Sequence, residues 1–142
     1  MKPRMLALAA ALAAVALVPV VAAAAVGPVT VDGKRPGRVA DTNIGRVITT
    51  PGRLGFYYWD VEKAGRTIRC KGSCLVAWPP VYVKGPVAKR VKGVGAVFGT
   101  IRRGARLQLT VNGLPAYLYQ GDAPGIVRCD GVDGWHAFRP SS

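Results

Sequence analysis

The chain has 142 residues, which is enough for one ordinary domain and too few for two. Half of the residues are hydrophobic, which argues against disorder of the whole chain, and 20 Lys and Arg outnumber 7 Asp and Glu. The single histidine, His136, excludes a centre built from several histidines. No catalytic constellation is recognisable in the sequence, so we predict a protein without enzymatic activity, cofactor or metal.

The first 25 residues have the features of a secretory signal peptide. Lys2 and Arg4 give a positive start, an apolar stretch follows, and Ala22–Ala25 offers a small-residue cleavage site. The apolar run is long enough for a membrane anchor, but Pro19 and the alanines fit cleavage better. We therefore expect removal of residues 1–25 and a mature chain that is secreted or associated with the cell envelope, without a transmembrane span. No cysteine lies near the cleavage region, so no lipid anchor is expected.

Residues 26–41 contain turn formers and charges without sustained periodicity, which predicts a flexible tether. We expect the folded part to be one compact all-β domain over residues 42–142. Its strands are predicted from short β-type runs separated by Gly and Pro: Arg46–Thr50, Leu54–Trp59, Val94–Arg103 and Trp135–Phe138. The one helical candidate is a single turn at Cys74–Trp78, because two prolines follow it.

A β-hairpin is the clearest local prediction. Asn112-Gly113 separates the apolar runs Leu107–Val111 and Leu114–Tyr119, and this dipeptide suits a two-residue turn that needs positive φ at both positions. The turn pairs Val111 with Leu114 and places the leucines of the first run on the core face. The opposite face then carries the remaining side chains of the two strands: Arg106, Gln108, Thr110, Pro115, Tyr117 and Tyr119.

Two segments share a pattern of Tyr, any residue, an aromatic residue, two further residues and an acid. Each segment follows a Pro-Gly or Asn-Gly turn and precedes a cysteine and then a tryptophan at nearly the same interval. This predicts a duplicated unit, with copies at about residues 46–80 and 106–140. The motif residues are Tyr57, Trp59 and Glu62 in the first copy, and Tyr117, Tyr119 and Asp122 in the second.

Together with the stretch from Cys70 to Pro80, which reads Cys-Lys-Gly-Ser-Cys-Leu-Val-Ala-Trp-Pro-Pro, these motifs resemble a bacterial family of secreted and lipoprotein-type repeats. The family is named for its Tyr-x-aromatic-x-x-Asp motif, and the resemblance covers roughly residues 46–140. It implies an exported, mostly β domain with no established biochemical activity. The chain departs from the family at Glu62, where the family has Asp, and in having no lipobox cysteine.

The motif aromatics have two interpretations. In a strand Tyr57 and Trp59 share one face, as do Tyr117 and Tyr119, so we expect ordinary packing in a sheet. The acid that follows would then cap a turn or pair with an arginine. The alternative is a surface on which sugars or other flat ligands stack.

The three cysteines point to one disulfide in an exported protein. We favour Cys70–Cys74 with Cys129 free over a bridge that involves Cys129. The alternative function is a thiol-disulfide or electron-transfer accessory protein that uses Cys70, Cys74 and the aromatic clusters, although the spacing is not Cys-x-x-Cys. His136 stands between aromatic residues and is expected to be a packing residue.

Charge is the strongest functional signal. From Lys63 to Gly121 there are 11 basic residues and no acidic one, and such a stretch attracts polyanions. No base-reading motif points to specific binding of nucleic acid. We therefore predict a binding domain for an anionic polymer or envelope surface, with general basicity of composition as the alternative. The predicted anion-binding residues are Lys89, Arg90, Lys92, Arg102, Arg103 and Arg106.

Overall fold

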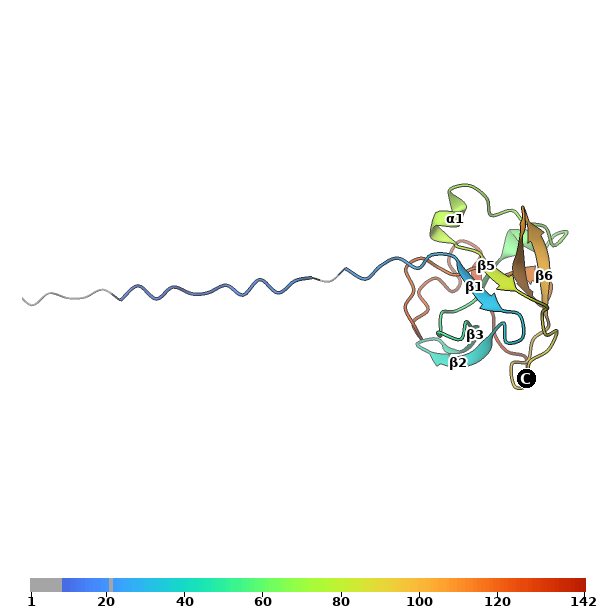
Figure 1. The fold of residues 1–142 in the computed structure, drawn as a ribbon, viewed down its shortest axis with the longest axis horizontal. Helices are drawn as coiled ribbons and strands as arrows, with labels where there is room; N and C mark the ends of the chain where they lie inside the picture. Colours follow the sequence, from blue (N-terminus) through green and yellow to red (C-terminus); the bar gives the residue numbers. More distant parts are fainter. Residues whose placement is uncertain (1–8, 21) are drawn as a thin grey trace, which may run out of the picture.

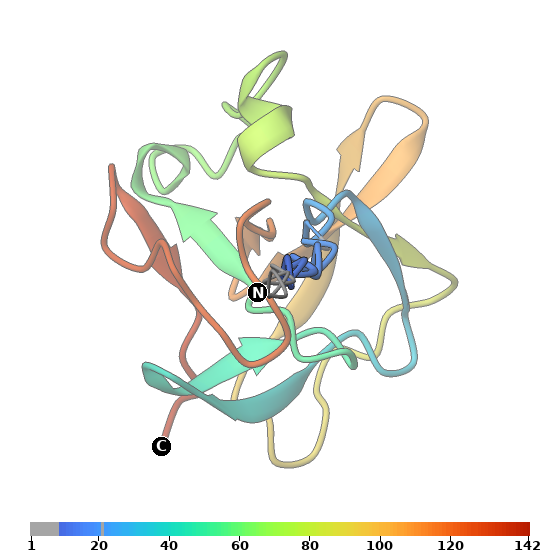
Figure 2. The same cartoon turned by 90° about the vertical axis from the view of Figure 1, so that its left-hand side faces the viewer.

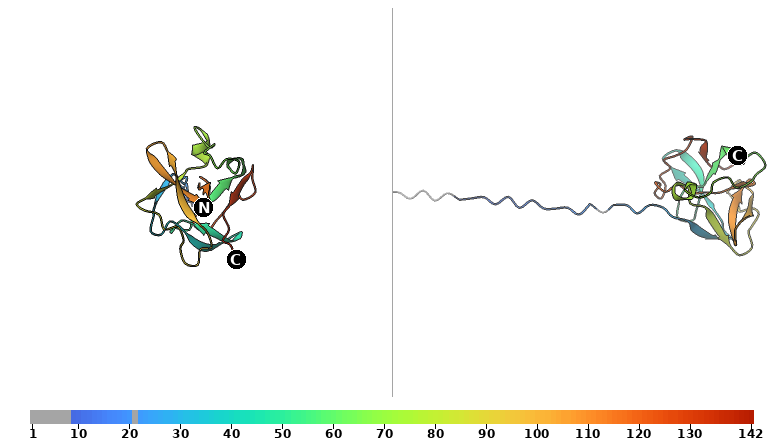
Figure 3. Two further views of the ribbon diagram at one scale, coloured as in Figure 1. Left: turned by 90° about the vertical axis from the view of Figure 1, so that its right-hand side faces the viewer. Right: turned by 90° about the horizontal axis from the view of Figure 1, so that it is seen from above.

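The computed structural model describes residues 9–20 and 22–142, so the predicted signal-peptide charges at Lys2 and Arg4 lie outside the described residues. Residues 9–20 form neither helix nor strand and lead away from the folded domain as an extended chain (Figures 1 and 3). Within the described part of the chain no helix is both long and apolar enough to cross a membrane.

The regular secondary structure of the domain is almost entirely short strands, as the sequence predicts. Its largest sheet has the order β1-β5-β7-β6, with β8 paired to β7 beside β5. β1 runs parallel to β5, and the other neighbours in this sheet are antiparallel. The strands are β1 (Val29–Asp32), β5 (Val81–Lys84), β6 (Phe98–Arg103), β7 (Arg106–Val111) and β8 (Leu114–Pro115).

Two small antiparallel ladders complete the fold (Figure 2). One joins β2 (Arg38–Thr42) to β3 (Gly45–Thr49), and the other joins β4 (Tyr57–Trp59) to β9 (Trp135–Ala137). Helical structure is confined, within the described residues, to the 3₁₀ turn η1 (Asp60–Glu62) and the single-turn α1 (Cys74–Ala77). The predicted helical turn before the two prolines is thus confirmed.

The prediction of a flexible tether over residues 26–41 is wrong. β1 forms an edge of the largest sheet, with Val31 buried, and β2 pairs along its whole length with β3. The backbone N–H of Val26 already donates to the carbonyl of Gln120 at 2.9 Å. β1 has only four residues, which is too short for a sustained alternation of apolar and polar side chains. Its partner β5 lies about fifty residues further along the chain, so the local sequence does not reveal the pairing.

The predicted hairpin is present, with one difference. Asn112 and Gly113 have φ values of 51° and 79°, and Val111 pairs with Leu114 as expected. The second strand then leaves β7, so Leu107 has no partner there and stays exposed, whereas Gln108 is fully buried. Leu107 therefore does not belong to the core.

The core consists of two clusters. The first lies against the largest sheet and includes Ile48, Phe56, Val81, Phe98, Leu109, Val111 and Leu118. The second is richer in aromatic residues and includes Val47, Tyr57, Cys70, Trp78, Tyr117, Val127 and Trp135. The two Tyr-x-aromatic motifs therefore meet in the second cluster.

Candidate functional site

The first tyrosines of the two motifs lie side by side in the interior. Tyr57 and Tyr117 form an antiparallel bridge, in which each backbone N–H donates to the carbonyl of the other at 2.8 and 3.0 Å. Both side chains are fully buried. The two motifs, separated by about sixty residues of sequence, thus become direct neighbours.

The first tyrosine of each motif donates a hydrogen bond to the acid of the other motif. The Tyr57 hydroxyl donates to Oδ2 of Asp122 at 2.7 Å, and the Tyr117 hydroxyl donates to Oε1 of Glu62 at 2.7 Å. We call these two exchanged pairs the motif clasp. The acids accept hydrogen bonds from tyrosine hydroxyls rather than from arginine side chains. The first and last residues of each motif therefore contact the other motif.

The same acids also order the backbone ahead of the cysteines. Oε1 of Glu62 accepts the backbone N–H groups of Arg69 and Cys70 at 2.8 and 3.0 Å. Oδ1 of Asp122 accepts the backbone N–H of Arg128 at 3.0 Å. Buried polar groups need such partners, because an unpaired donor in the interior costs free energy. The clasp therefore connects each motif to its own cysteine segment as well as to the other motif.

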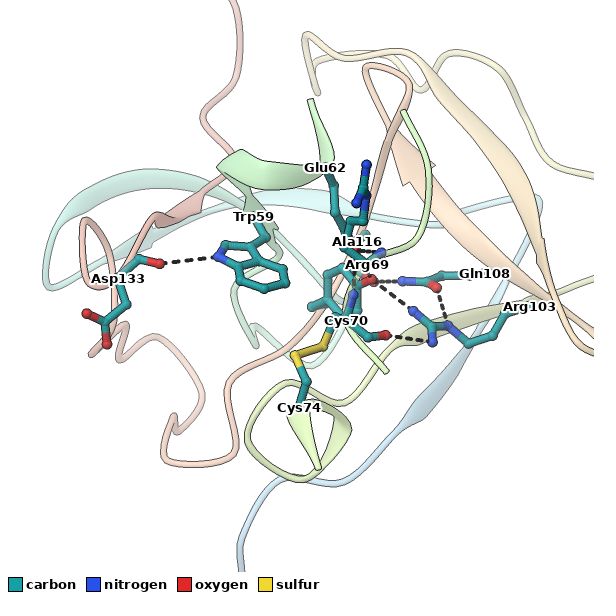
Figure 4. The surroundings of a disulfide bond; sticks show 10 residues. Trp59, Glu62, Arg69, Cys70, Cys74, Arg103, Gln108, Ala116 and Asp133 are labelled. Atoms are coloured by element: carbon teal, nitrogen blue, oxygen red, sulfur yellow. Dashed lines mark hydrogen bonds between the residues drawn. A yellow bond between two sulfur atoms is a disulfide. The ribbon is translucent and has the colours of Figure 1, made fainter. Parts of the chain in front are cut away.

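Arg103 joins the first half of the clasp to the backbone of the disulfide loop (Figure 4). Its guanidinium donates to Oε1 of Gln108 at 2.7 Å, to the carbonyl of Cys70 at 3.0 Å and to the hydroxyl of Tyr117 at 2.9 Å. The phenol of Tyr117 thus lies between the carboxylate of Glu62 and the guanidinium. Arg103 was predicted to bind anions, but the structure uses its donors inside the domain.

Burial keeps both tyrosines of the clasp protonated. Desolvation, followed by the hydrogen bond to Asp122, raises the pKa of Tyr57 far above its usual range. Desolvation, followed by the hydrogen bond to Glu62, does the same to the pKa of Tyr117. Each hydroxyl therefore remains a hydrogen-bond donor at any physiological pH.

The buried acid of the second motif makes stability depend on pH. Burial raises the pKa of Asp122 above its ordinary value of about 3.9, although the hydrogen bond from Tyr57 opposes this shift. The folded chain then holds this proton more tightly than the unfolded chain. The contribution of Asp122 to stability is therefore fullest at low pH and is lost as the pH rises through the raised pKa.

We expect Asp122→Asn to abolish this dependence. The free energy of unfolding of the parent chain, relative to the variant, should fall as the pH rises from the ordinary aspartate pKa of about 3.9 through the raised pKa of Asp122. Urea unfolding at several pH values measures the difference. Parallel pH profiles for the two chains would contradict the assignment.

Indole rings stack beside the clasp. Trp135 lies between Trp59 and Trp78, with interplanar angles of 2° and 7° and ring centroids 5.2 and 3.8 Å apart. Tyr119 packs against Trp78 at 5.0 Å. Both faces of Trp135 are therefore covered by other rings of the domain. The arrangement supports packing as the role of these aromatics rather than a stacking surface for flat ligands.

The disulfide joins Cys70 to Cys74, with Cα atoms 5.4 Å apart, and Cys129 is free and half-buried. The predicted pairing is thus confirmed. The disulfide closes a short loop that leads into α1, and the backbone of Cys70 contacts Glu62 and Arg103 on its two sides (Figure 4).

His136 belongs to a separate, half-exposed cluster on the β4–β9 ladder. Its Nε2 lies 2.8 Å from Oδ2 of Asp60 and its ring stacks on Tyr58, while Lys63 pairs with Oδ1 of Asp60 at 2.9 Å. The hydrogen bonds from Lys63 and then His136 lower the pKa of Asp60. Sequence reasoning missed Asp60, because its partner histidine lies in a strand 76 residues away.

The predicted anion-binding residues fall into two groups at opposite ends of β6. Lys89, Arg90 and Lys92 lie exposed in the loop before β6, where the carbonyl of Lys89 accepts the N–H of Phe98. Arg102, Arg103 and Arg106 lie at the tip of the β6–β7 hairpin. The strand between them spans about 16 Å, which exceeds the screening length of about 8 Å at physiological ionic strength. The two groups therefore act as separate charged regions.

The side chain of Arg106 is engaged with the sheet. Its guanidinium carbon lies 3.4 Å from the ring centroid of Tyr82, and Nη2 donates to the Thr30 hydroxyl at 3.0 Å. Arg102 makes no such contact among the described residues and is exposed.

Comparison of the chain with protein-family models, with curated proteins and with solved structures finds no match.

Proposed function

We propose that this chain is an exported, non-enzymatic domain that binds an anionic polymer or envelope surface through the bases of residues 63–121. The observation that carries the proposal is the exposure of those bases. Ten of the 11 are exposed, Arg103 being half-buried, and of these 11 bases only Lys63 forms an ion pair with a described residue. Solvent-facing charges without acidic partners are available to an external polyanion.

Export is supported by the pattern of the first 25 residues and by the disulfide. A structural disulfide is typical of proteins that function in an oxidising compartment. The proposed mature chain starts near Val26, whose N–H contacts Gln120 at the surface of the domain. Removal of the preceding residues therefore leaves every strand intact.

We also infer that the domain consists of two related units, with copies at about 46–80 and 106–140, as in the repeat family that the motifs resemble. The motif clasp supports this inference, because the two tyrosine–acid pairs are exchanged in the same way. Each acid, in addition, contacts the backbone just before or at the cysteine that follows it.

The experiment is binding of the purified mature chain to poly(glycerol phosphate) and to heparin at increasing salt. Replacing Lys89, Arg90 and Lys92 with Gln should weaken both interactions, because these three exposed positive charges attract the polyanion to the loop. For a phosphate polymer, the slope of log affinity against log salt should decrease by about two. Circular dichroism should show an unchanged fold.

The matched control replaces Arg46, Arg53 and Arg128 with Gln. These bases are also exposed and carry the same total charge, but they lie outside the 63–121 stretch. This control should retain most of the binding. Binding that neither raised salt nor the loop substitutions reduce would overturn the proposed function and would leave the charge as a property of composition.

A further inference from the structure

A groove lies between the disulfide loop and the tip of the β6–β7 hairpin. Figures 1 and 2 show α1 and this hairpin tip at the same end of the molecule, away from the loop that carries Lys89. The groove has a volume of about 430 Å³, within the range of small-molecule sites. It is lined by Ile68, Lys71, Gly72, Leu75, Arg102, Arg103 and Gly104, and we call it the hairpin groove.

The charged side chains of the hairpin groove are all positive. Lys71 and Arg102 are exposed, and neither forms a side-chain hydrogen bond or an ion pair within the described part of the chain. Arg103 adds a third positive group at the inner wall, although its donors point into the domain. No acid lines the groove. Two unengaged cations, Lys71 and Arg102, thus line one cavity although they lie 31 positions apart in the sequence, and this favours an anionic ligand.

The remaining lining is apolar. Ile68 and Leu75 are half-buried, so each keeps part of its side chain exposed beside the cations. Gly72 and Gly104 have φ values of 60° and 58°, and a Cβ on either would meet no atom within 4 Å. The turns at these glycines therefore leave the rim of the groove without covering side chains. A ligand that combines an anion with a hydrocarbon group matches both parts of the lining.

The two walls of the groove are fixed to each other. The disulfide closes the loop that carries Lys71, and Arg103 from the hairpin donates to the carbonyl of Cys70 at 3.0 Å. Arg103 is held in turn by Gln108 and Tyr117. A site formed in advance loses less conformational entropy on binding than a flexible one.

We infer that the hairpin groove binds the phosphate ester of an anionic lipid, with the phosphate between Lys71 and Arg102 and the adjoining alkyl carbons over Ile68 and Leu75. A tetrahedral phosphate directs oxygens toward cations on two different walls. This inference rests on the proposed function and specifies it, since it names one chemical class of envelope component and one site. The loop at Lys89 remains the region for long polyanions.

Octyl phosphate below its micelle concentration is the probe, and isothermal titration calorimetry is the measurement. Octyl phosphate should bind at least tenfold more tightly than ethyl phosphate or inorganic phosphate, because each buried methylene adds favourable transfer free energy. In the ¹⁵N NMR spectrum of the chain, the largest shifts should occur at the amides of Lys71, Gly72 and Arg102. Equal affinity for octyl and inorganic phosphate would overturn the inference.

The variant K71Q/R102Q should lose at least tenfold in affinity for octyl phosphate, because both cations that face the head group are removed. Both residues are exposed, so the fold should survive, as an intact disulfide and an unchanged circular dichroism spectrum would show. The matched control is the Lys89, Arg90 and Lys92 substitution, which should leave octyl phosphate binding unchanged. Equal losses in the two variants would overturn the assignment of the site.

The source of the phosphate is tested with two further probes. Vesicles containing phosphatidylglycerol should retain the parent chain and release K71Q/R102Q, whereas poly(glycerol phosphate) should be affected mainly by the Lys89 substitutions. If the groove variant loses polymer binding but octyl phosphate never binds, the groove is part of the polymer surface and the lipid inference fails. If octyl phosphate binds but polymer retention is insensitive to salt and to the Lys89 substitutions, the proposed function of the loop fails while the groove stands.

Discussion

Glu62→Ala is expected to lower the free energy of unfolding by about 3–5 kcal/mol. The carboxylate is fully buried, and one of its oxygens accepts from the Tyr117 hydroxyl and from the N–H groups of Arg69 and Cys70. Alanine leaves these three donors without their acceptor, and it removes the negative group that faces Arg103 across Tyr117. Urea unfolding followed by tryptophan fluorescence measures the loss.

The control is Asp41→Ala in β2. Asp41 is exposed and its carboxylate has no hydrogen bond or ion pair among the described residues, so the substitution should change stability by no more than about 0.5 kcal/mol. Glu62→Gln keeps one carbonyl oxygen and should retain part of the stability that alanine loses. Equal stability of the Glu62→Ala and Asp41→Ala variants would show that the clasp does not stabilise the domain.

A double-mutant cycle isolates the exchanged pair. Tyr117→Phe removes only the hydroxyl that donates to Glu62 and accepts from Arg103. Combined with Glu62→Ala, it should cost less than the sum of the single substitutions, because both remove the same hydrogen bond. Additive losses would place the two residues in independent roles.

The second large effect is expected at the disulfide. Cys70→Ser and Cys74→Ser should each lower the free energy of unfolding by an amount near the low end of about 2–4 kcal/mol, since the closed loop is short. Each substitution also frees the loop next to Glu62 and Arg103, which the backbone of Cys70 contacts. Cys129→Ser should cost much less, because Cys129 is unbridged and half-buried.

Free-thiol counting checks the same assignment chemically. The purified chain should contain one free thiol, and the disulfide should survive a mild reductant. A Cys129→Ser variant as unstable as Cys70→Ser would contradict the pairing. Rapid reduction under mild conditions would instead favour the thiol-disulfide accessory function.

The repeated spacing in the sequence identified the residues of the motif clasp, but it did not identify which residue hydrogen-bonds to which. Tyr57, Glu62, Tyr117 and Asp122 were singled out by their repeated spacing, and all four are buried together in one network. The pairing of each tyrosine with the acid of the other motif is invisible in sequence. It depends on the Tyr57–Tyr117 bridge, which brings distant segments into contact.

The sequence by itself determined the local structure of this protein. Asn112-Gly113 specified the hairpin turn, paired prolines ended α1, and close spacing favoured the Cys70–Cys74 disulfide, because each depends on backbone preferences or on a short loop. Only the tertiary structure decided that β1 joins the sheet, that Arg103 turns inward, and that the predicted bases separate into two regions. It alone brought Lys71 and Arg102 into the lining of one groove. These outcomes depend on contacts between segments far apart in the chain, and such contacts form only when the strands assemble around a shared core.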